Sequence, residues 1–400
     1  MFGYKKPIGI LVTIVAGLAS AHVMAQSNNK SDKSSFRNNL KYGAPVKAKP
    51  TKERSVPAEK TAALYKNPKW KAPKTAWGAP DLQGVWTSDD MRSVPMNRPK
   101  KFGTQTELTP AEFDKRAERD QAARNRAVND ETFLRNEWGV RTFGYSSMII
   151  DPKDGQAPAL TKVGMERAKD RPRGTYGPGP YNTVDQFSLY ERCITRGVLG
   201  SVLPVLYGNG LRIVQAPGKV VISYEMIHDT RTIYLDDGHD HPNNNIKQYM
   251  GLSHGHWEGN TLVVTTTNFK NTTSIGVNGN GAPNSYKLKM TERFTRIDPD
   301  MINYVATIDD PVTYKKPWTI RLTITHQPHY HVYEYSCHEG NTAVKLPLSG
   351  ERAFDRKVAE AKAKGLPIPK REKYPGFAAY GPPKKDAKVI DVNTGKAVDQ

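Results

Sequence analysis

An acid, an imidazole and a permanent cation lie close together in the sequence at Glu225, His228 and Arg231. Proton transfer uses a carboxylate or an imidazole, and a guanidinium can hold the anion that develops. In a flat strand, residues 225 and 231 face one side and residue 228 faces the other, so a bulge near His228 must bring the three together. The alternative is a surface ion pair beside a separate core histidine.

A second polar group lies at the end of a predicted strand, 331–337, which carries Glu334 and leads into His338. On another predicted strand, Glu292 and Arg293 must face opposite sides, and an inward charge there needs a partner from a ligand or a neighbouring strand. The predicted catalytic residues are Glu225, His228, Arg231 and His338. The predicted ligand-binding residues are Tyr224, His241, Trp257, Glu292, Tyr335, Glu339 and Asn341.

Histidine pairs raise the question of a metal site, because neutral imidazole is a ligand for zinc and copper. Most of these histidines lie in predicted Gly/Asn/Pro loops, and no carboxylate stands at a recognised ligand spacing. We therefore expect no catalytic metal and no cofactor, and a structural metal remains open. The histidines concerned are His239, His241, His254, His256, His326, His329 and His331.

The elements that must position these side chains are short β-type runs separated by turn residues. Such short connections favour an all-β, mainly antiparallel barrel or sandwich. We favour the barrel, because closure removes exposed edges and leaves an interior that can hold a small ligand. The predicted strands are 211–215, 220–227, 232–235, 261–268, 286–297, 301–309, 319–325 and 331–337.

Peripheral helices are predicted near 109–126 and 351–364, with a shorter one near 161–169. Thr109, Pro110 and Glu112 form a helix start with a capping box. The organisation that follows is a signal peptide at 1–25, a disordered basic leader at 26–75, a single β-rich domain with a helical insertion at 76–350, and a terminal helix with a basic tail at 351–400.

The N-terminus has the features of an export signal. Lys5 and Lys6 precede an apolar run at 8–21, and small residues predict a cut after Ala25. The run is too short to span a membrane stably, although an N-terminal anchor is the alternative. We expect a periplasmic or secreted protein without an integral membrane span. In an oxidising compartment Cys193 and Cys337 form a disulfide or remain two buried thiols.

The formal net charge of +19 lies largely in the flanking segments. Solvated basic tails explain such a distribution, and we expect no nucleic-acid partner. The sequence contains no Walker loop, no Gly-x-Ser-x-Gly and no His-Glu-x-x-His motif. Nucleotide-driven chemistry and the common serine-hydrolase mechanism are therefore disfavoured.

Several runs in this order resemble a large family of secreted bacterial proteins, most of them hypothetical. The resemblance covers most of 80–350 and implies no particular activity. Members often carry Arg at the position of His254, which counts against a metal site there. Gly84-Val85-Trp86 also resembles the first strand of lipocalin-type barrels. The runs are 220–231, 255–264, 292–294, 310–311, 317–319 and 333–341.

These features predict an exported enzyme that binds an aromatic, terpenoid-like or sugar-derived molecule. Its chemistry would be acid/base catalysis of the lyase, hydratase, isomerase or hydrolase type. A non-catalytic ligand-binding protein of the same architecture is the first alternative. A module that binds polyanions or the cell envelope through its basic flanks is the second.

Overall fold

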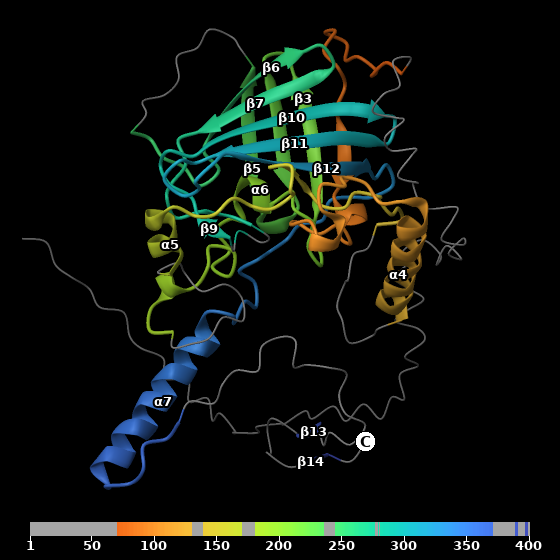
Figure 1. Cartoon of the computed structure of the whole chain (residues 1–400). Coiled ribbons are helices and arrows are strands. Elements are labelled where there is room, and N and C mark those ends of the chain that lie inside the picture. The colour runs from red at the N-terminus through yellow and green to blue at the C-terminus, as the bar shows by residue number, and fades with distance from the viewer. Residues whose placement is uncertain are drawn as a thin grey trace, which may run out of the picture. The chain divides into compact units, whose positions relative to one another are not determined.

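Nine strands close into a β-barrel in the computed structural model (Figure 1). The structure describes residues 70–129, 139–169, 181–235, 245–276, 279, 281–370, 389–390 and 397–398. Pairing of Trp86 with His326 joins the first and last strands and closes the barrel. The order around the barrel is β1 (Gly84–Thr87), β3 (Gly210–Ala216), β4 (Lys219–Tyr224), β5 (Thr230–Leu235), β6 (Leu252–Glu258), β7 (Thr261–Thr267), β10 (Lys289–Asp298), β11 (Met301–Asp309) and β12 (Trp318–His326).

The all-β barrel expected from the sequence is confirmed, with two differences in its strands. Strand β6 was not predicted, because Gly255 and two histidines interrupt its apolar pattern. It pairs with β5 in parallel, whereas all the other barrel pairings are antiparallel. The predicted strand 331–337 is wrong: this segment has no ladder partner in the described part of the chain. One further strand, β2 (Ile149–Asp151), pairs with β12 but is not part of the closed barrel.

The predicted peripheral helices are also present. Thr109 and Glu112 form the expected capping box, with the Thr109 N–H donating to Glu112 Oε2 over 2.9 Å. The terminal helix begins at Lys345, ahead of the predicted residue 351. No helix in the described ranges is long and apolar enough to cross a membrane. The helices are α4 (Pro110–Asn129), α5 (Lys162–Lys169), α6 (Gly197–Gly200) and α7 (Lys345–Ala363), with 3-10 turns η1 (Asp89–Met91), η2 (Lys100–Phe102), η3 (Val184–Gln186) and η4 (Met226–His228). Short strand pairs complete the fold: β8 (Ser274–Ile275) with β9 (Ala282–Pro283), and β13 (Val389–Ile390) with β14 (Ala397–Val398).

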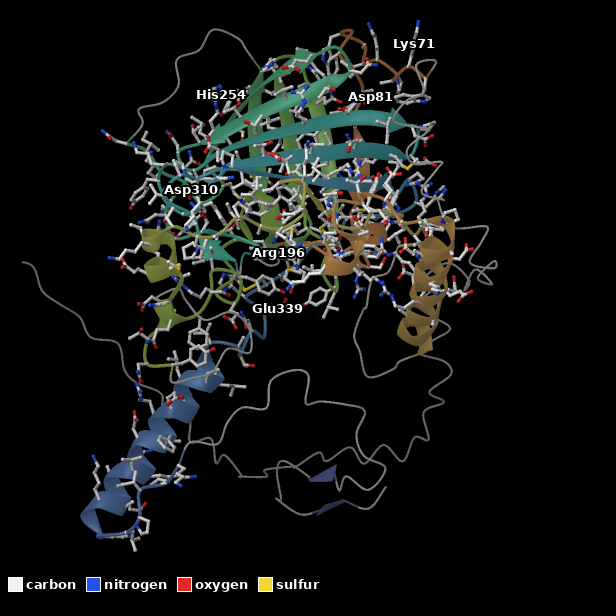
Figure 2. The ribbon with its side chains drawn as sticks, in the orientation of Figure 1. Lys71, Asp81, Arg196, His254, Asp310 and Glu339 are labelled. Carbon is white, nitrogen blue, oxygen red and sulfur yellow. A yellow bond between two sulfur atoms is a disulfide. The ribbon has the colours of Figure 1, made fainter. Side chains whose placement is uncertain are left out.

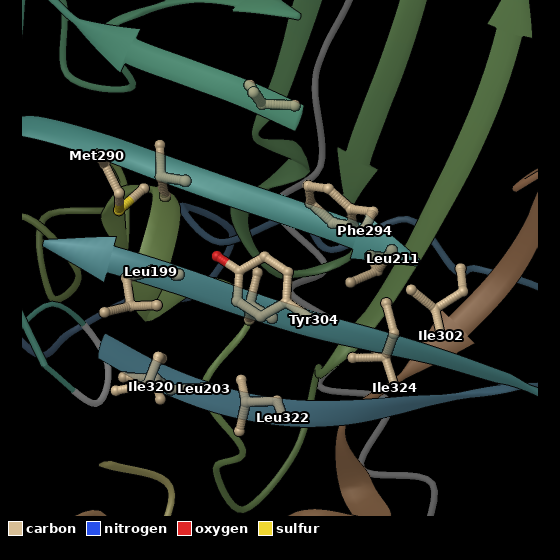
Figure 3. Packing of buried hydrophobic residues seen from close by; sticks show 14 of the residues in the cluster. Leu199, Leu203, Leu211, Met290, Phe294, Ile302, Tyr304, Ile320, Leu322 and Ile324 are labelled. Carbon is tan, nitrogen blue, oxygen red and sulfur yellow. The ribbon is translucent and has the colours of Figure 1, made fainter. Parts of the chain in front are cut away.

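Strand direction defines two ends of the barrel. The turn end carries the β3–β4, β6–β7 and β10–β11 turns, and the loop end carries the β4–β5 connection and the segment around α6. Leu199 and Leu203, in and just after α6, join the barrel core, so this segment closes the loop end (Figure 3).

Side chains fill the centre of the barrel. Alternating residues of each strand point inward, and they are mostly aliphatic or aromatic. Phe294 and Tyr304 pack ring against ring with centroids 4.9 Å apart. The interior that the sequence predicted as space for a ligand is thus largely occupied by the core (Figure 3).

One ion pair interrupts this apolar interior. Arg231 donates two hydrogen bonds to Glu292, over 2.6 and 2.7 Å, and the side chains are 3% and 0% exposed. Tyr304 donates to the same carboxylate over 2.9 Å. Burial on its own lowers the pKa of Arg231, but the adjacent Glu292 carboxylate outweighs it and holds that pKa above its usual range. Arg231 therefore stays charged, and its two hydrogen bonds to Glu292 tie β5 to β10.

Removing one partner of this pair should destabilise the barrel more than removing both. Arg231→Met or Glu292→Met leaves an uncompensated buried charge, which costs about 3–5 kcal/mol of unfolding free energy. The Arg231→Met/Glu292→Met double variant should lose less than either single variant in urea unfolding. The matched control is the exposed pair Arg293–Glu258, 2.6 Å apart, where Glu258→Gln should change stability far less than either single methionine variant does. Equal losses in all four variants would contradict this account.

Candidate functional site

The three residues that the sequence grouped do not converge in the structure. Arg231 lies inside the barrel on β5, held by Glu292. The η4 turn, which contains His228, lies between Glu225 and the strand that carries Arg231. In this turn Ile227 and His228 adopt the left-handed backbone region, at φ 65° and 55°. This turn takes Glu225 and His228 to the loop end, so the expected bulge does not bring Arg231 to them. The predicted ligand contact Tyr224 is also interior, and burial raises its pKa to about 12 although Arg231 lowers it.

Glu225 and His228 both contact the segment that follows β12. Glu225 is buried and accepts a hydrogen bond from the Tyr330 hydroxyl over 2.7 Å. A methyl group at Gly210 would overlap the Glu225 carboxylate, so only glycine leaves room for it there. His228 Nε2 accepts the Tyr335 backbone N–H over 2.8 Å, which places the proton of the neutral ring on Nδ1. An acid and an imidazole thus lie on one stretch of chain at the loop end.

A disulfide fixes this segment to the protein. Cys193 and Cys337 are bonded, with their Cα atoms 5.6 Å apart, so the disulfide that the sequence left as one of two outcomes is present. The predicted ligand residue Asn341 lies beside it and donates to the Glu191 carbonyl over 3.1 Å. The bond closes a loop with a sequence separation of 144. It places Tyr335 next to residues that precede β3.

The remaining predicted site residues lie elsewhere. His338 and Glu339 are exposed on the segment near the disulfide, where no strand gives them a common face. Trp257 lies at the turn end of the barrel, away from Glu225 and His228. His241 falls outside the described residues.

Three residues that the sequence did not indicate complete a cluster with Tyr335. Arg196 lies against the ring of Tyr190, with its guanidinium carbon 5.2 Å from the ring centroid. The hydroxyls of Tyr190 and Tyr207 are 3.3 Å apart, and Tyr207 also exchanges a hydrogen bond with Tyr335. We call Tyr190, Arg196, Tyr207 and Tyr335 the tyrosine–arginine cluster. Figure 2 shows Arg196 below the strands and Asp81 beside the upper ones.

Arg196 is a buried cation whose charge no carboxylate in the described chain balances. It is 2% exposed and donates to the carbonyls of Gly208 over 3.1 Å and Tyr207 over 3.2 Å. Its Nε atom is buried without a hydrogen-bond partner among the described residues. Burial lowers the pKa of Arg196, and the titratable groups that counteract this effect are tyrosines. Carbonyl dipoles stabilise such a cation less than an anion would.

Buried arginines elsewhere in the fold have a different environment. Arg98 is equally buried, but Nε donates to the Ser146 hydroxyl over 3.0 Å and the remaining nitrogens donate to carbonyls. No tyrosine hydroxyl takes part in its shell. Arg196 differs from Arg98 in having an Nε atom without a partner in the described chain and three neighbouring phenol groups that are themselves only half-buried. The cluster is therefore open toward solvent on its tyrosine side.

The tyrosine hydroxyls of the cluster remain protonated donors at neutral pH. Burial raises the pKa of Tyr190 to about 12, and it also raises the pKa of Tyr207 and of Tyr335. Arg196 acts in the opposite direction on all three without overcoming burial. A neutral hydroxyl beside a cation is a donor suited to an anionic acceptor.

Metal ligation is not a feature of the described residues: no three His, Cys, Asp or Glu side chains there are grouped closely enough to hold an ion. His256 Nε2 instead lies 3.2 Å from Glu258 Oε1, and the His254 ring packs near Tyr234 with centroids 5.8 Å apart. No protein-family model, no curated protein and no solved structure matches this chain.

Loss of the disulfide should lower the free energy of unfolding and loosen the attachment of Tyr335 to the rest of the cluster. In the chain-entropy model a closed loop of this length contributes on the order of 5 kcal/mol, and strain commonly reduces the measured value to about 2–4 kcal/mol. We expect Cys193→Ser/Cys337→Ser to lose an amount in that range in urea unfolding. Dithiothreitol should destabilise the native protein similarly and leave the variant unchanged. A variant within about 0.5 kcal/mol of the native protein would contradict a structural role for the bond.

Proposed function

We propose that this protein binds small organic anions at the tyrosine–arginine cluster. The observation that carries the proposal is Arg196, a guanidinium at 2% exposure without a carboxylate partner in the described chain. An anionic ligand would supply the missing counter-charge, and the tyrosine hydroxyls would donate to it. The sequence predicted that Arg231 holds the anion. We assign this role to Arg196 instead, because Arg231 already binds Glu292.

The composition of the cluster favours a ligand that also carries a ring. Tyr190, Tyr207 and Tyr335 are each partly exposed, so their faces offer aromatic surface around the charge. A pair of packed aromatic rings contributes about 0.5–1.5 kcal/mol of interaction free energy in addition to the contribution from the apolar area that it buries. An aromatic or cyclic carboxylate therefore suits the cluster better than a small inorganic anion does.

Acid/base catalysis on such a ligand is the finer form of this proposal. His228 is bonded to the backbone of Tyr335, a member of the cluster, and its Nδ1–H is a hydrogen-bond donor at the exposed edge. Glu225, hydrogen-bonded to Tyr330 on the same segment, supplies a carboxylate. Neighbouring groups of this kind serve elimination, hydration, isomerisation and hydrolysis. A binding protein without turnover is the alternative, and it uses the same cluster.

We also propose that the protein works outside the cytoplasm. The Cys193–Cys337 bond supports this location, since disulfides persist in oxidising compartments. The predicted export signal and the resemblance to secreted bacterial proteins agree with it. The signal itself lies outside the described residues.

Binding of benzoate, with benzamide as its neutral counterpart, tests the anion site. We expect the native protein to bind benzoate in isothermal titration calorimetry at least about tenfold more tightly than benzamide, since a hydrogen bond to a charged group contributes about 1.5–3 kcal/mol. Tyr207→Phe and Tyr335→Phe should each weaken benzoate binding about tenfold by removing one donor, and Arg196→Met should remove the preference for the anion.

The matched controls are Tyr286→Phe and Arg212→Met, which alter exposed side chains. Both should bind benzoate as the native protein does. The unfolding free energy of each variant should be measured as well, so that a loss of binding can be distinguished from a loss of the fold. Equal affinity for benzoate and benzamide in the native protein would overturn the proposal.

Benzoate affinity should persist into alkaline solution and then disappear. Burial raises the hydroxyl pKa values above their usual value of 10, for Tyr190 to about 12, so loss of the donor protons is displaced to more alkaline solution. Above the raised pKa values a phenolate would repel the ligand. We expect constant affinity from pH 7 to 10 and a steep loss as the pH approaches 12, checked by calorimetry with circular dichroism confirming the fold. A loss centred well below pH 10 would argue against tyrosine donors.

A further inference from the structure

The chain that follows β12 lies outside the closed barrel. The barrel is already complete where His326 pairs with Trp86. We call residues 327–341 the post-barrel segment. Among the described residues, the backbone-to-backbone hydrogen bonds of residues 328–341 stay within this segment. The barrel ladder therefore does not depend on the segment, whereas the tyrosine–arginine cluster does, because Tyr335 is one of its members.

The disulfide is the strongest restraint on Tyr335. The Tyr335 backbone N–H donates to His228 Nε2 over 2.8 Å, and water competes with an exposed hydrogen bond of this kind, so its net contribution is small. Tyr330 holds only the start of the segment, through its hydroxyl. The covalent bond from Cys337, two residues after Tyr335, fixes its Cα atom 5.6 Å from that of Cys193. Without this bond we expect Tyr335 to leave the cluster.

The two sulfur atoms of the bond differ in access. Cys193 is 7% exposed, whereas Cys337 is half-buried between the exposed residues Ser336 and His338. A thiolate reductant therefore reaches the sulfur of Cys337 first, and Cys193 leaves as a thiolate. Asn341 Nδ2 donates a hydrogen bond to Cys193 Sγ over 3.1 Å. Because a donor favours the charged form of the sulfur, Asn341 assists the departure of Cys193.

We infer that the Cys193–Cys337 bond is a redox switch for the anion site, an inference that rests on the proposed function. A dithiol reductant supplies two electrons and two protons. Its first sulfur bonds to Cys337 Sγ as the protein S–S bond breaks, and its second sulfur then displaces Cys337, which leaves two protein thiols and the oxidised reductant. In the reduced protein the post-barrel segment detaches, and the cluster loses the Tyr335 hydroxyl.

The direction of the switch follows from the compartment. Cytosolic thiols stay reduced, and disulfides form in oxidising compartments. A chain that is exported, as we propose for this protein, is therefore made with an incomplete cluster. The reverse reaction, with a disulfide oxidant as the electron acceptor, completes the cluster after export. The protein then binds its anion tightly only where the bond has formed.

Equilibrium dialysis with benzoate tests the switch, on the native oxidised protein and on the same protein reduced with dithiothreitol. We expect reduction to weaken benzoate binding at least about tenfold, as in Tyr335→Phe, since both changes remove the same donor. Cys193→Ser/Cys337→Ser should bind benzoate as the reduced protein does and should not respond to dithiothreitol. Coupling between two equilibria is reciprocal, so saturating benzoate should make the native bond harder to reduce by the same factor.

Hydrogen–deuterium exchange gives a readout that does not depend on benzoate. Reduction should speed exchange in residues 330–341 while β11 and β12 stay protected, since the barrel closes without the segment. Asn341→Leu removes the donor to sulfur, so dithiothreitol should reduce this variant about tenfold more slowly than the native protein. The matched control is Thr342→Val, which alters an exposed neighbour and should be reduced at the native rate.

Three results would overturn the inference: equal benzoate affinity in the oxidised and reduced protein, unchanged exchange in residues 330–341 after reduction, or loss of protection in β11 and β12 as well. Absence of benzoate binding in both states overturns the anion site itself, together with its regulation. Reduction of Asn341→Leu at the native rate overturns the role assigned to Asn341.

Discussion

Moving a cation out of water is costly, and two arginines of this protein meet that cost differently. Arg231, in the barrel, forms two hydrogen bonds with Glu292 and is balanced within the fold. Arg196, at the loop end, donates to carbonyl groups and lies among tyrosines. The first arrangement leaves no charge for a ligand. The second leaves positive charge behind neutral donors, which is the electrostatic setting of an anion site.

The barrel and the disulfide together bring the second arrangement about. Residues 190–207 precede the barrel strands of the central region, and Tyr335 follows the last strand, so only tertiary structure makes them neighbours. Closure of β12 onto β1 determines where the chain leaves the barrel. The Cys193–Cys337 bond then holds that outgoing segment against the loop that carries Arg196. The same segment contacts Glu225 and His228, so one piece of chain joins these two residues to Tyr335 of the cluster.

The sequence was informative wherever apolar alternation was regular. Strands such as β11 and β12 follow it closely, and the capping box of α4 could be recognised from three residues. Alternation failed for β6, where Gly255 packs against Ile233 and larger residues would not fit. It also misled at 331–337, where a disulfide and side-chain contacts hold an extended chain without a ladder.

The site was only partly predictable for a related reason. Glu225, His228, Tyr335 and Asn341 were identified as polar residues near strand ends, and they do lie around the loop end. Arg231 was predicted to hold an anion and either Glu292 or Arg293 to point inward, but the pairing of Arg231 with Glu292 depends on strand order around the barrel, which local patterns do not specify. Arg196 lies three residues after Cys193. The assumption of a disulfide would have placed it near Tyr335, and that signal was present in the sequence.

We propose that Arg196 and its tyrosines accept an anion that balances the buried charge. Anomalous diffraction from crystals soaked in 4-bromobenzoate tests it directly, because bromine marks the ligand unambiguously. We expect a bromine peak at the tyrosine–arginine cluster, with the carboxylate accepting hydrogen bonds from tyrosine hydroxyls, and no such peak in crystals of Arg196→Met. Native crystals without bromine at the cluster, or an equal peak in the variant, would contradict it.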